Sequence, residues 1–294
     1  MGPKNWTIKD LLEITTDYLK KKDIDSPRLS AEILLAHQLN IKRVNLYLNF
    51  DQPLNDDEIA GYRSLIRRRL NREPIQYITG IQEFWSMAFK VGPQVLIPRP
   101  ESELLVEQTI SLYKEKRLPG THSPRILDLG TGCGAIAISI ARELEDASIW
   151  ASDISQEAVD LAMLNSRKHG VGERIQFIVG DLFEPFMYQN LTFDIILSNP
   201  PYIASDDFDS LSPEVRDHEP RLALDGHVEG MFFIEKVIMV GADYLHPGGW
   251  ILLEMDPAQT TKALKLIEES GHYGEKKPIK DYSHHDRVVM AQKI

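Results

Sequence analysis

Cysteine and positive charge are both scarce in this sequence, and each shortage excludes a class of protein. The one cysteine, Cys133, rules out an internal disulfide and a zinc site built from several cysteines. Lysine and arginine number 33 against 44 aspartates and glutamates, for a formal net charge of -11. Because phosphate binding needs clustered positive side chains, this balance argues against a broad nucleic-acid surface.

Metal-ligand spacing and long apolar runs are also missing. The nine histidines include the adjacent pair His284 and His285 but no set spaced like metal ligands, so we expect no metal site. No apolar run approaches the length of a membrane span, and no signal-peptide pattern opens the sequence. We therefore expect a cytoplasmic protein that contacts neither a membrane nor nucleic acid directly, and we expect it to be a monomer.

The first part of the chain has helical spacing. With 294 residues and 43% hydrophobic content, the chain is long enough for two modest domains. In residues 1–83, apolar residues recur at helical spacing after possible N-caps such as Thr7 and Asn55, which predicts a small helical bundle. The last of these helices and the residues just beyond it carry five arginines: Arg63, Arg67, Arg68, Arg69 and Arg72. These side chains form either a solvated helix face or a docking surface for an acidic protein or RNA.

Strand-like segments begin after the helical part. Residues 84–91 and 95–97 are short apolar segments on either side of Gly92 and Pro93, which predicts a β-hairpin linker over residues 84–98. From residue 99 to residue 294, strand and helix patterns alternate, as is typical of a doubly wound α/β sheet. The expected strands are residues 125–129, 149–153, 175–179, 193–198, 250–254 and 287–291.

A glycine-rich loop follows the first of these strands. The segment Asp128-Leu129-Gly130-Thr131-Gly132-Cys133-Gly134 lets the backbone turn tightly and lets a ligand approach main-chain atoms. Asp153, at the end of the next strand, is typical of a carboxylate that accepts both hydroxyls of a ribose. The Gly-x-Gly-x-Gly spacing departs from the dinucleotide form, and Asp128 favours a ligand with an ammonium group. These residues therefore predict binding of S-adenosylmethionine, with Asp181 and Leu182 placed to meet its adenine.

The segment Asn199-Pro200-Pro201-Tyr202 closes the apolar strand at 193–198. The two prolines fix successive φ angles, so the Asn199 side chain and the Pro200 carbonyl become fixed acceptors for a planar NH2 group. Tyr202 adds an aromatic face for the same group. We therefore expect Asn199, Pro200 and Tyr202 to be catalytic, with Pro201 completing the substrate site. No strong base is expected, since positioning and electrostatics supply most of the gain.

Taken together, these motifs resemble the PrmC/HemK family of protein-glutamine methyltransferases that act on peptide chain release factors. The resemblance covers nearly the whole chain and is carried by segments 72–80, 83–85 and 97–101 as well as by the glycine loop and residues 199–202. Residues 224–226 and 286–288 also resemble the family. The chain departs from it at Ser102, where Thr is more frequent, and at Asp256, where Gly is usual.

The resemblance implies a class I S-adenosylmethionine-dependent methyltransferase fold over residues 99–294, with seven strands of which the last is antiparallel. It implies an enzyme of translation termination that methylates the glutamine of the Gly-Gly-Gln loop in class 1 peptide chain release factors. The helical domain would then bind the release factor. Carried over by position, Gly130 to Gly134, Asp153, Leu182 and Asn199 would contact the cofactor.

Other classes of function fit part of the same pattern. An amino-methyltransferase acting on adenine or guanine in DNA or RNA would also need a clamp for a planar NH2 group. A nonenzymatic nucleotide-binding protein would keep the glycine loop without turnover. A nicotinamide dehydrogenase would also use a glycine-rich loop and a downstream acidic residue, although with a different glycine spacing, and a spectral titration would exclude it.

Overall fold

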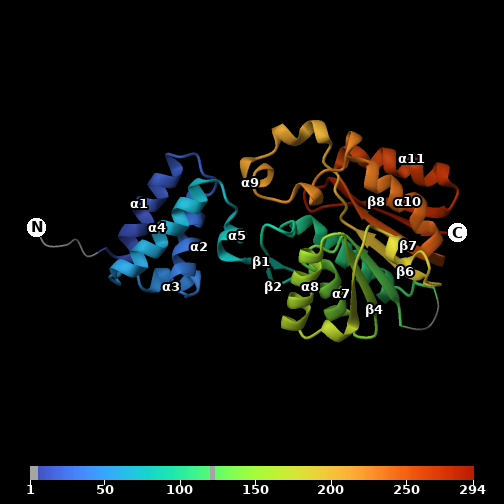
Figure 1. The fold of residues 1–294 in the computed structure, drawn as a ribbon, viewed down its shortest axis with the longest axis horizontal. Helices are drawn as coiled ribbons and strands as arrows, with labels where there is room; N and C mark the ends of the chain where they lie inside the picture. The colour runs from blue at the N-terminus through green and yellow to red at the C-terminus, as the bar shows by residue number, and fades with distance from the viewer. Residues whose placement is uncertain (1–5, 120–122) are drawn as a thin grey trace, which may run out of the picture. The chain divides into compact units, whose positions relative to one another are not determined.

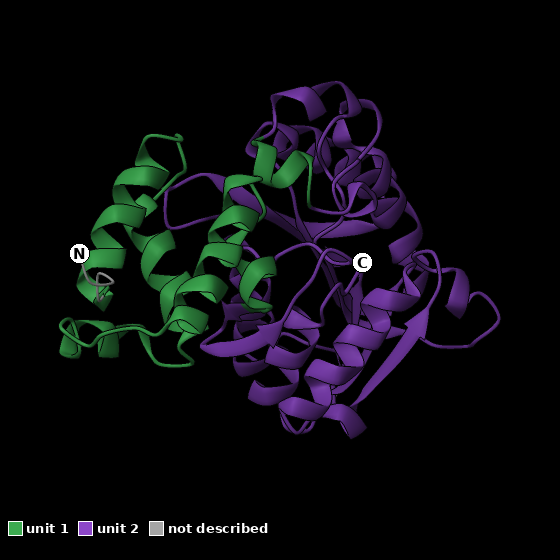
Figure 2. Ribbon diagram, turned by 60° about the vertical axis from the view of Figure 1, so that its left-hand side comes forward, with its two compact units in different colours: residues 1–81, 212–218 green, residues 82–211, 219–294 purple. Residues whose placement is uncertain are grey.

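A computed structural model describes residues 6–119 and 123–294, which separate into two compact units (Figures 1 and 2). One unit holds residues up to 81 together with 212–218, and the other holds residues 82–211 and 219–294. The division differs from the expected boundaries in two places. The linker at 84–98 belongs to the second unit, and the short segment 212–218, expected inside the methyltransferase domain, belongs to the helical one because its side chains bond there.

The helical unit buries one apolar face of each long helix in a shared core. Its helices are α1 (Ile8–Lys20), α2 (Pro27–Gln38), α3 (Arg43–Leu48), α4 (Asp56–Leu70), α5 (Ile75–Thr79) and α9 (Pro213–Arg216). Thr7 and Asn55 each accept a hydrogen bond at the start of a helix in a capping box, as the sequence indicates. Leu12, Leu34 and Tyr62 are among the fully enclosed side chains of this core.

Three of the arginines near the end of α4 are engaged inside the helical unit. The Arg69 side chain is buried, and its Nη2 lies 3.0 Å from Oε1 of Glu214 on α9. Arg72 donates to the Asp23 carbonyl at 2.9 Å, and Arg68 Nε donates to Glu73 at 2.8 Å. These contacts hold α4, the chain after it and segment 212–218 together, so most of the arginine cluster is structural.

The second unit contains a seven-stranded, mostly parallel sheet. In spatial order its strands are β5 (Ile175–Val179), β4 (Ser148–Asp153), β3 (Arg125–Leu129), β6 (Phe193–Ser198), β7 (Leu245–Glu254), β9 (Asp286–Lys293) and β8 (Tyr273–Lys280). The last strand, β9, runs antiparallel to both β7 and β8, which confirms the expected class I fold. The sequence analysis did not place β8, because this edge strand is rich in lysine and half exposed.

Helices cover both faces of the sheet (Figure 1). On one face lie α7 (Ala135–Glu143) and α8 (Gln156–Lys168), with α6 (Glu103–Lys114) packed beside α7. On the other lie α10 (Phe232–Tyr244) and α11 (Thr260–Ser270). Short 3-10 turns complete the unit: η1 (Pro100–Ser102), η2 (Gly172–Arg174), η3 (Glu184–Phe186), η4 (Ser205–Ser210), η5 (Arg221–Ala223), η6 (Val228–Gly230) and η7 (Pro257–Gln259).

The hairpin exists, but its predicted position is wrong. Its strands are β1 (Ile81–Phe84) and β2 (Met87–Lys90), and the turn between them is formed by Trp85 and Ser86 with φ values of 49° and 56°. Two positive φ angles in a two-residue loop match the twist of a hairpin. The turn was missed because neither residue is glycine, whereas the Gly92-Pro93 pair that suggested a turn lies beyond β2.

The strand order changes direction between β3 and β6, and the carboxyl ends of the parallel strands meet at this point. Leu129 pairs with Ser152 of β4 and with Ser198 of β6, so the loops that follow these strands start side by side. Open α/β sheets bind ligands at such a switch point. Among the described residues, no helix is both long and apolar enough to cross a membrane.

Candidate active site

The glycine loop after β3 depends on backbone conformations that side chains disfavour. Gly130 and Gly132 have φ values of 72° and 56°, and a Cβ atom added at either would meet nothing within 4 Å. Both positions therefore need glycine for its φ angle rather than for lack of room. Below the loop, buried Asn165 of α8 donates to the Cys133 carbonyl at 2.9 Å and also bonds the backbone of Lys90 in β2. No sequence pattern marks Asn165 for this role.

Asp153 faces the glycine loop from the end of β4. Its Oδ2 accepts from the Gly132 amide at 2.8 Å and its Oδ1 from the Ser155 amide at 3.0 Å. Burial raises the pKa of Asp153, and these backbone hydrogen bonds oppose the rise. Each carboxylate oxygen can accept more than one hydrogen bond, so both remain able to receive ribose hydroxyls.

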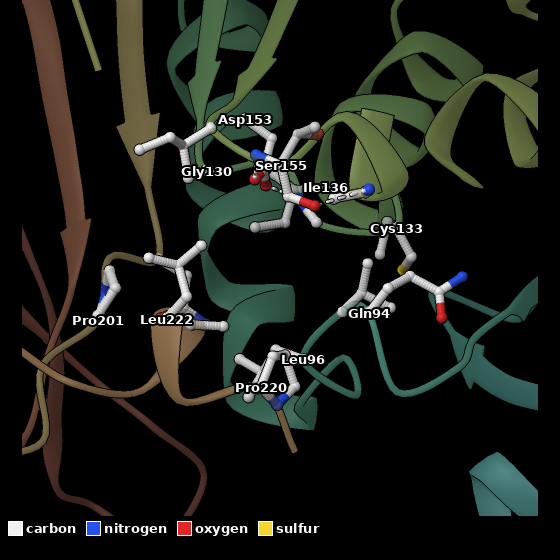
Figure 3. A pocket seen from close by; sticks show the side chains of 18 of the residues that line it. Gln94, Leu96, Gly130, Cys133, Ile136, Asp153, Ser155, Pro201, Pro220 and Leu222 are labelled. Carbon is white, nitrogen blue, oxygen red and sulfur yellow. Dashed lines mark hydrogen bonds between the residues drawn. The ribbon is translucent and has the colours of Figure 1, made fainter. Parts of the chain in front are cut away.

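A cavity of about 330 Å³ opens along this edge of the sheet (Figure 3). Its walls include nine of the predicted site residues: Gly130, Thr131, Gly132, Cys133, Asp153, Asp181, Leu182, Asn199 and Pro201. Four others lie outside the lining, namely Asp128, Gly134, Pro200 and Tyr202. Figure 3 shows Gly130 and Asp153 at one end of the cavity and Leu96 and Pro220 at the other.

Asp128 lies beneath the loop rather than on the cavity wall. It is fully buried, and its Oδ2 accepts from the Thr131 hydroxyl at 2.7 Å. Within residues 6–119 and 123–294, its Oδ1 has no hydrogen-bond partner. Burial raises the pKa of Asp128 to about 7. The bare backbone at Gly130 and Gly132 leaves room for a ligand at the loop, while contact of a cationic group with Asp128 stays a prediction.

Cys133 is unsuited to nucleophilic chemistry. It is buried, and burial raises the pKa of its thiol to about 12. A thiol with so high a pKa is not ionised near neutral pH. Its place in the cavity wall is therefore that of a small lining residue.

Two loops that the sequence analysis did not assign to the site form the opposite wall. The first runs from Gln94 to Pro98 and the second from Pro220 to Ala223. Buried Glu219 joins them, because its Oε2 accepts from the Ile97 amide at 3.2 Å and its Oε1 bonds Arg99 at 2.6 Å. Sequence patterns gave no sign of this pairing, since the partners are more than a hundred residues apart.

The segment after β6 is fixed by side chains from several elements. Asn199 Nδ2 donates to Ser102 Oγ at 3.0 Å, and the Tyr202 hydroxyl donates to Glu254 Oε1 at 3.3 Å. Gln259 Nε2 donates to the Tyr202 carbonyl at 2.8 Å, which anchors the backbone after the two prolines. Ser102 takes one of the two Nδ2 hydrogens of Asn199, and the carbonyl oxygen Oδ1 is the acceptor of this cavity-lining side chain.

No metal centre accompanies the site in the part of the chain that the structure describes. There, no group of three or more His, Cys, Asp or Glu side chains could hold a metal ion. Asp181 has one charged neighbour within salt-bridge range, Lys236, whose Nζ lies 3.9 Å from Oδ2. The cavity wall itself offers hydrogen-bond acceptors and is mainly apolar.

Comparison with known proteins agrees with this geometry. Residues 10–80 match the family described as PrmC N-terminal domain, and residues 104–215 match the methyltransferase small domain. The catalytic domain of hMettl16, solved in complex with the MAT2A 3'UTR hairpin 6, superposes with a TM-score of 0.57 at 13% identity, covering 76% of this chain and 80% of that one. At that identity the likeness shows the fold alone. Sheet, loop and family match together define a methyltransferase.

Full-length relatives make the assignment more specific. The release factor glutamine methyltransferase of Geobacter sulfurreducens is 42% identical over 269 residues, which are 92% of this chain and 91% of that protein. That of Rhodopirellula baltica is 40% identical over 288 residues, 98% of this chain and 97% of that protein. The chain belongs to the family of release factor glutamine methyltransferases.

Proposed function

We propose that the protein transfers a methyl group from S-adenosylmethionine to the side-chain amide nitrogen of the glutamine in the Gly-Gly-Gln loop of class 1 peptide chain release factors. The observation that carries the proposal is the Asn199 carboxamide, held by Ser102 so that Oδ1 is its acceptor at the cavity wall. A glutamine amide has a planar NH2 group that needs such an acceptor. Membership of the family supports a release factor as the substrate.

The residues that would hold the cofactor form one continuous edge. Asp153 would accept the ribose hydroxyls, Asp181 and Leu182 would meet the adenine, and the glycine loop with Asp128 beneath it would take the cationic amino-acid tail. When bound, S-adenosylmethionine supplies an electrophilic methyl group on a sulfonium. The chain contributes a preformed set of acceptors.

The clamp at residues 199–202 would orient the attacking nitrogen. Asn199 Oδ1 and the Pro200 carbonyl would accept the two amide hydrogens, holding the nitrogen in line with the methyl group. The amide nitrogen becomes acidic as the new bond forms, so its proton can pass to these acceptors and on to water. The apolar parts of the opposite wall, such as Leu96 and Leu222, would exclude water from the reacting atoms.

The test is methyl transfer from labelled S-adenosylmethionine to a purified class 1 release factor, to its Gly-Gly-Ala variant and to duplex DNA. We expect label on the wild-type factor alone. Equal labelling of the Gly-Gly-Ala variant would contradict the choice of residue. Labelling of DNA instead would mean that the planar NH2 group belongs to a base.

A further inference from the structure

A buried hydrogen-bonded chain leads from the end of β7 to Asn199. The Ser102 hydroxyl, at the end of η1, donates to Glu254 Oε2 at 2.6 Å and accepts from Asn199 Nδ2 at 3.0 Å. Glu254 is 1% exposed and Ser102 is 3% exposed. The three residues come from three separate elements, and only Asn199 and Ser102 line the cavity. The chain of contacts thus connects a side chain at the substrate site to a carboxylate behind it.

The direction of these hydrogen bonds follows from the charge of Glu254. An ionised carboxylate can only accept, so the single hydrogen of the Ser102 hydroxyl must point to it. Ser102 then has only lone pairs to offer Asn199. The carboxamide must therefore present its NH2 group to Ser102 and its oxygen to the substrate side. A neutral partner in place of the carboxylate would permit either orientation.

We propose that Glu254 and Ser102 are positioning residues that orient the Asn199 carboxamide so that its oxygen receives the NH2 group of the substrate amide. The inference rests on the proposed function, because an NH2 substrate is what makes the oxygen the required end. Neither residue takes part in methyl transfer itself.

The surroundings of Glu254 make its charged form costly, which suggests that the carboxylate is kept for a functional reason. The Tyr202 hydroxyl donates to its other oxygen, Glu101 of η1 repels it, and Arg287 of β9 attracts it. The carboxylate of Asp256, just beyond β7, also attracts this arginine, with its Oδ2 3.9 Å from Arg287 Nη1. On balance burial dominates and raises the pKa of Glu254 to about 7. Burying the charge of this carboxylate costs stability, and a neutral amide of the same shape avoids that desolvation cost.

A dependence of rate on pH follows from the same argument. When Glu254 is protonated, it can donate to Ser102, and the Ser102 hydrogen is then free to turn towards Asn199. The carboxamide loses its fixed orientation, so we expect kcat to rise as the pH increases through about 7. The Glu254→Gln variant should lack this limb of the profile.

The experiment compares Ser102→Ala, Ser102→Thr and Glu254→Gln with matched controls. Ser166→Ala removes a buried hydroxyl that bonds only within α8, and Asp194→Asn neutralises a buried carboxylate at the start of β6. We expect Ser102→Ala and Glu254→Gln to lower kcat about 10- to 100-fold, since small misplacements of reacting groups have effects of this size. Binding of S-adenosylhomocysteine should change less than about threefold, and Ser102→Thr should restore kcat.

Three outcomes would overturn the inference. These are a Glu254→Gln variant with the kcat and pH profile of the wild type, losses equally large in the controls, or a Ser102→Thr variant as slow as Ser102→Ala. An inactive wild type would instead refute the proposed function. In that case the positioning role can still be tested by the side-chain NH2 signals of Asn199 in an NMR spectrum. We expect these signals to shift in Ser102→Ala and Glu254→Gln but not in Ser166→Ala. Unshifted signals in the first two variants would refute the positioning role.

Discussion

The two halves of the active-site edge are built by different means. At β3 and β4, the backbone amide of Gly132 in the glycine loop bonds directly to Asp153, and residues of this loop line the cavity. At β6 and β7, the surface is the Asn199 side chain, held through Ser102 and Glu254. Under the proposed function, the first half binds the cofactor, whereas the oriented carboxamide of the second half positions the reacting group of the substrate. Changes in the first half should therefore affect affinity, and changes in the second should affect rate.

The largest effect should come from Asn199→Ala. Removing the carboxamide deletes the acceptor for the substrate NH2 group, so we expect kcat to fall by on the order of 100-fold or more. Cofactor affinity, measured by calorimetry with S-adenosylhomocysteine, should stay within a few-fold of the wild type. An Asn199→Ala variant with the turnover of the wild type would refute the role of Asn199. A loss of cofactor affinity as large as the loss of kcat would contradict the proposed difference between the two halves.

Asp153→Ala should show the opposite pattern. The substitution removes the acceptor for the Gly132 and Ser155 amides and, under the proposed function, the acceptor for the ribose hydroxyls. We expect the Kd for S-adenosylhomocysteine to rise about 10- to 100-fold, as for the loss of hydrogen bonds to a charged group. At saturating cofactor, kcat should recover most of its wild-type value. A variant that binds the cofactor normally would contradict the assignment of Asp153.

The pH dependence of the unfolding free energy should differ between the wild type and the Glu254→Gln variant. The pKa of Glu254 is raised from 4.5 to about 7 in the folded protein, so its favourable contribution is full below about pH 4.5 and is lost as the pH rises through about 7. Relative to the wild type, Glu254→Gln should therefore gain stability between pH 5 and pH 8, by on the order of 2 kcal/mol. Urea unfolding of both proteins at each pH measures this difference. Because Asp128 titrates in both, its contribution cancels, and a flat difference would contradict the raised pKa.

The smallest effect concerns the helical unit. Glu214→Gln weakens the ion pair with buried Arg69, which joins α9 to α4, and should cost about 1–3 kcal/mol of unfolding free energy. Lys265→Ala, which removes an exposed pair with Glu269, is the control and should cost less than about 0.5 kcal/mol. Thermal unfolding measures both. Cofactor affinity should be unchanged in each variant, and a loss of affinity in Glu214→Gln would place this pair in the account of the active site.

Local patterns predicted the features that have local causes. The apolar runs at 125–129 and 193–198 gave buried parallel strands, and the glycine loop and Asn199-Pro200 lie where these strands end. The features that were missed depend on partners far apart in sequence. Ser102 and Glu254 are 152 residues apart, and neither has a neighbour pattern that marks it. Strand β8 was missed because it is a lysine-rich, half-exposed edge strand. The turn at Trp85 was missed because neither of its two residues is glycine.

The central claim is that the site orients a glutamine amide for methylation. Its most direct test is mass-spectrometric mapping of a class 1 release factor after incubation with the enzyme and S-adenosylmethionine. We predict one added methyl group, located on the amide nitrogen of the Gly-Gly-Gln glutamine and absent with Asn199→Ala. A methyl group on any other residue, or on the same glutamine with the Asn199→Ala enzyme at wild-type rate, would contradict the account.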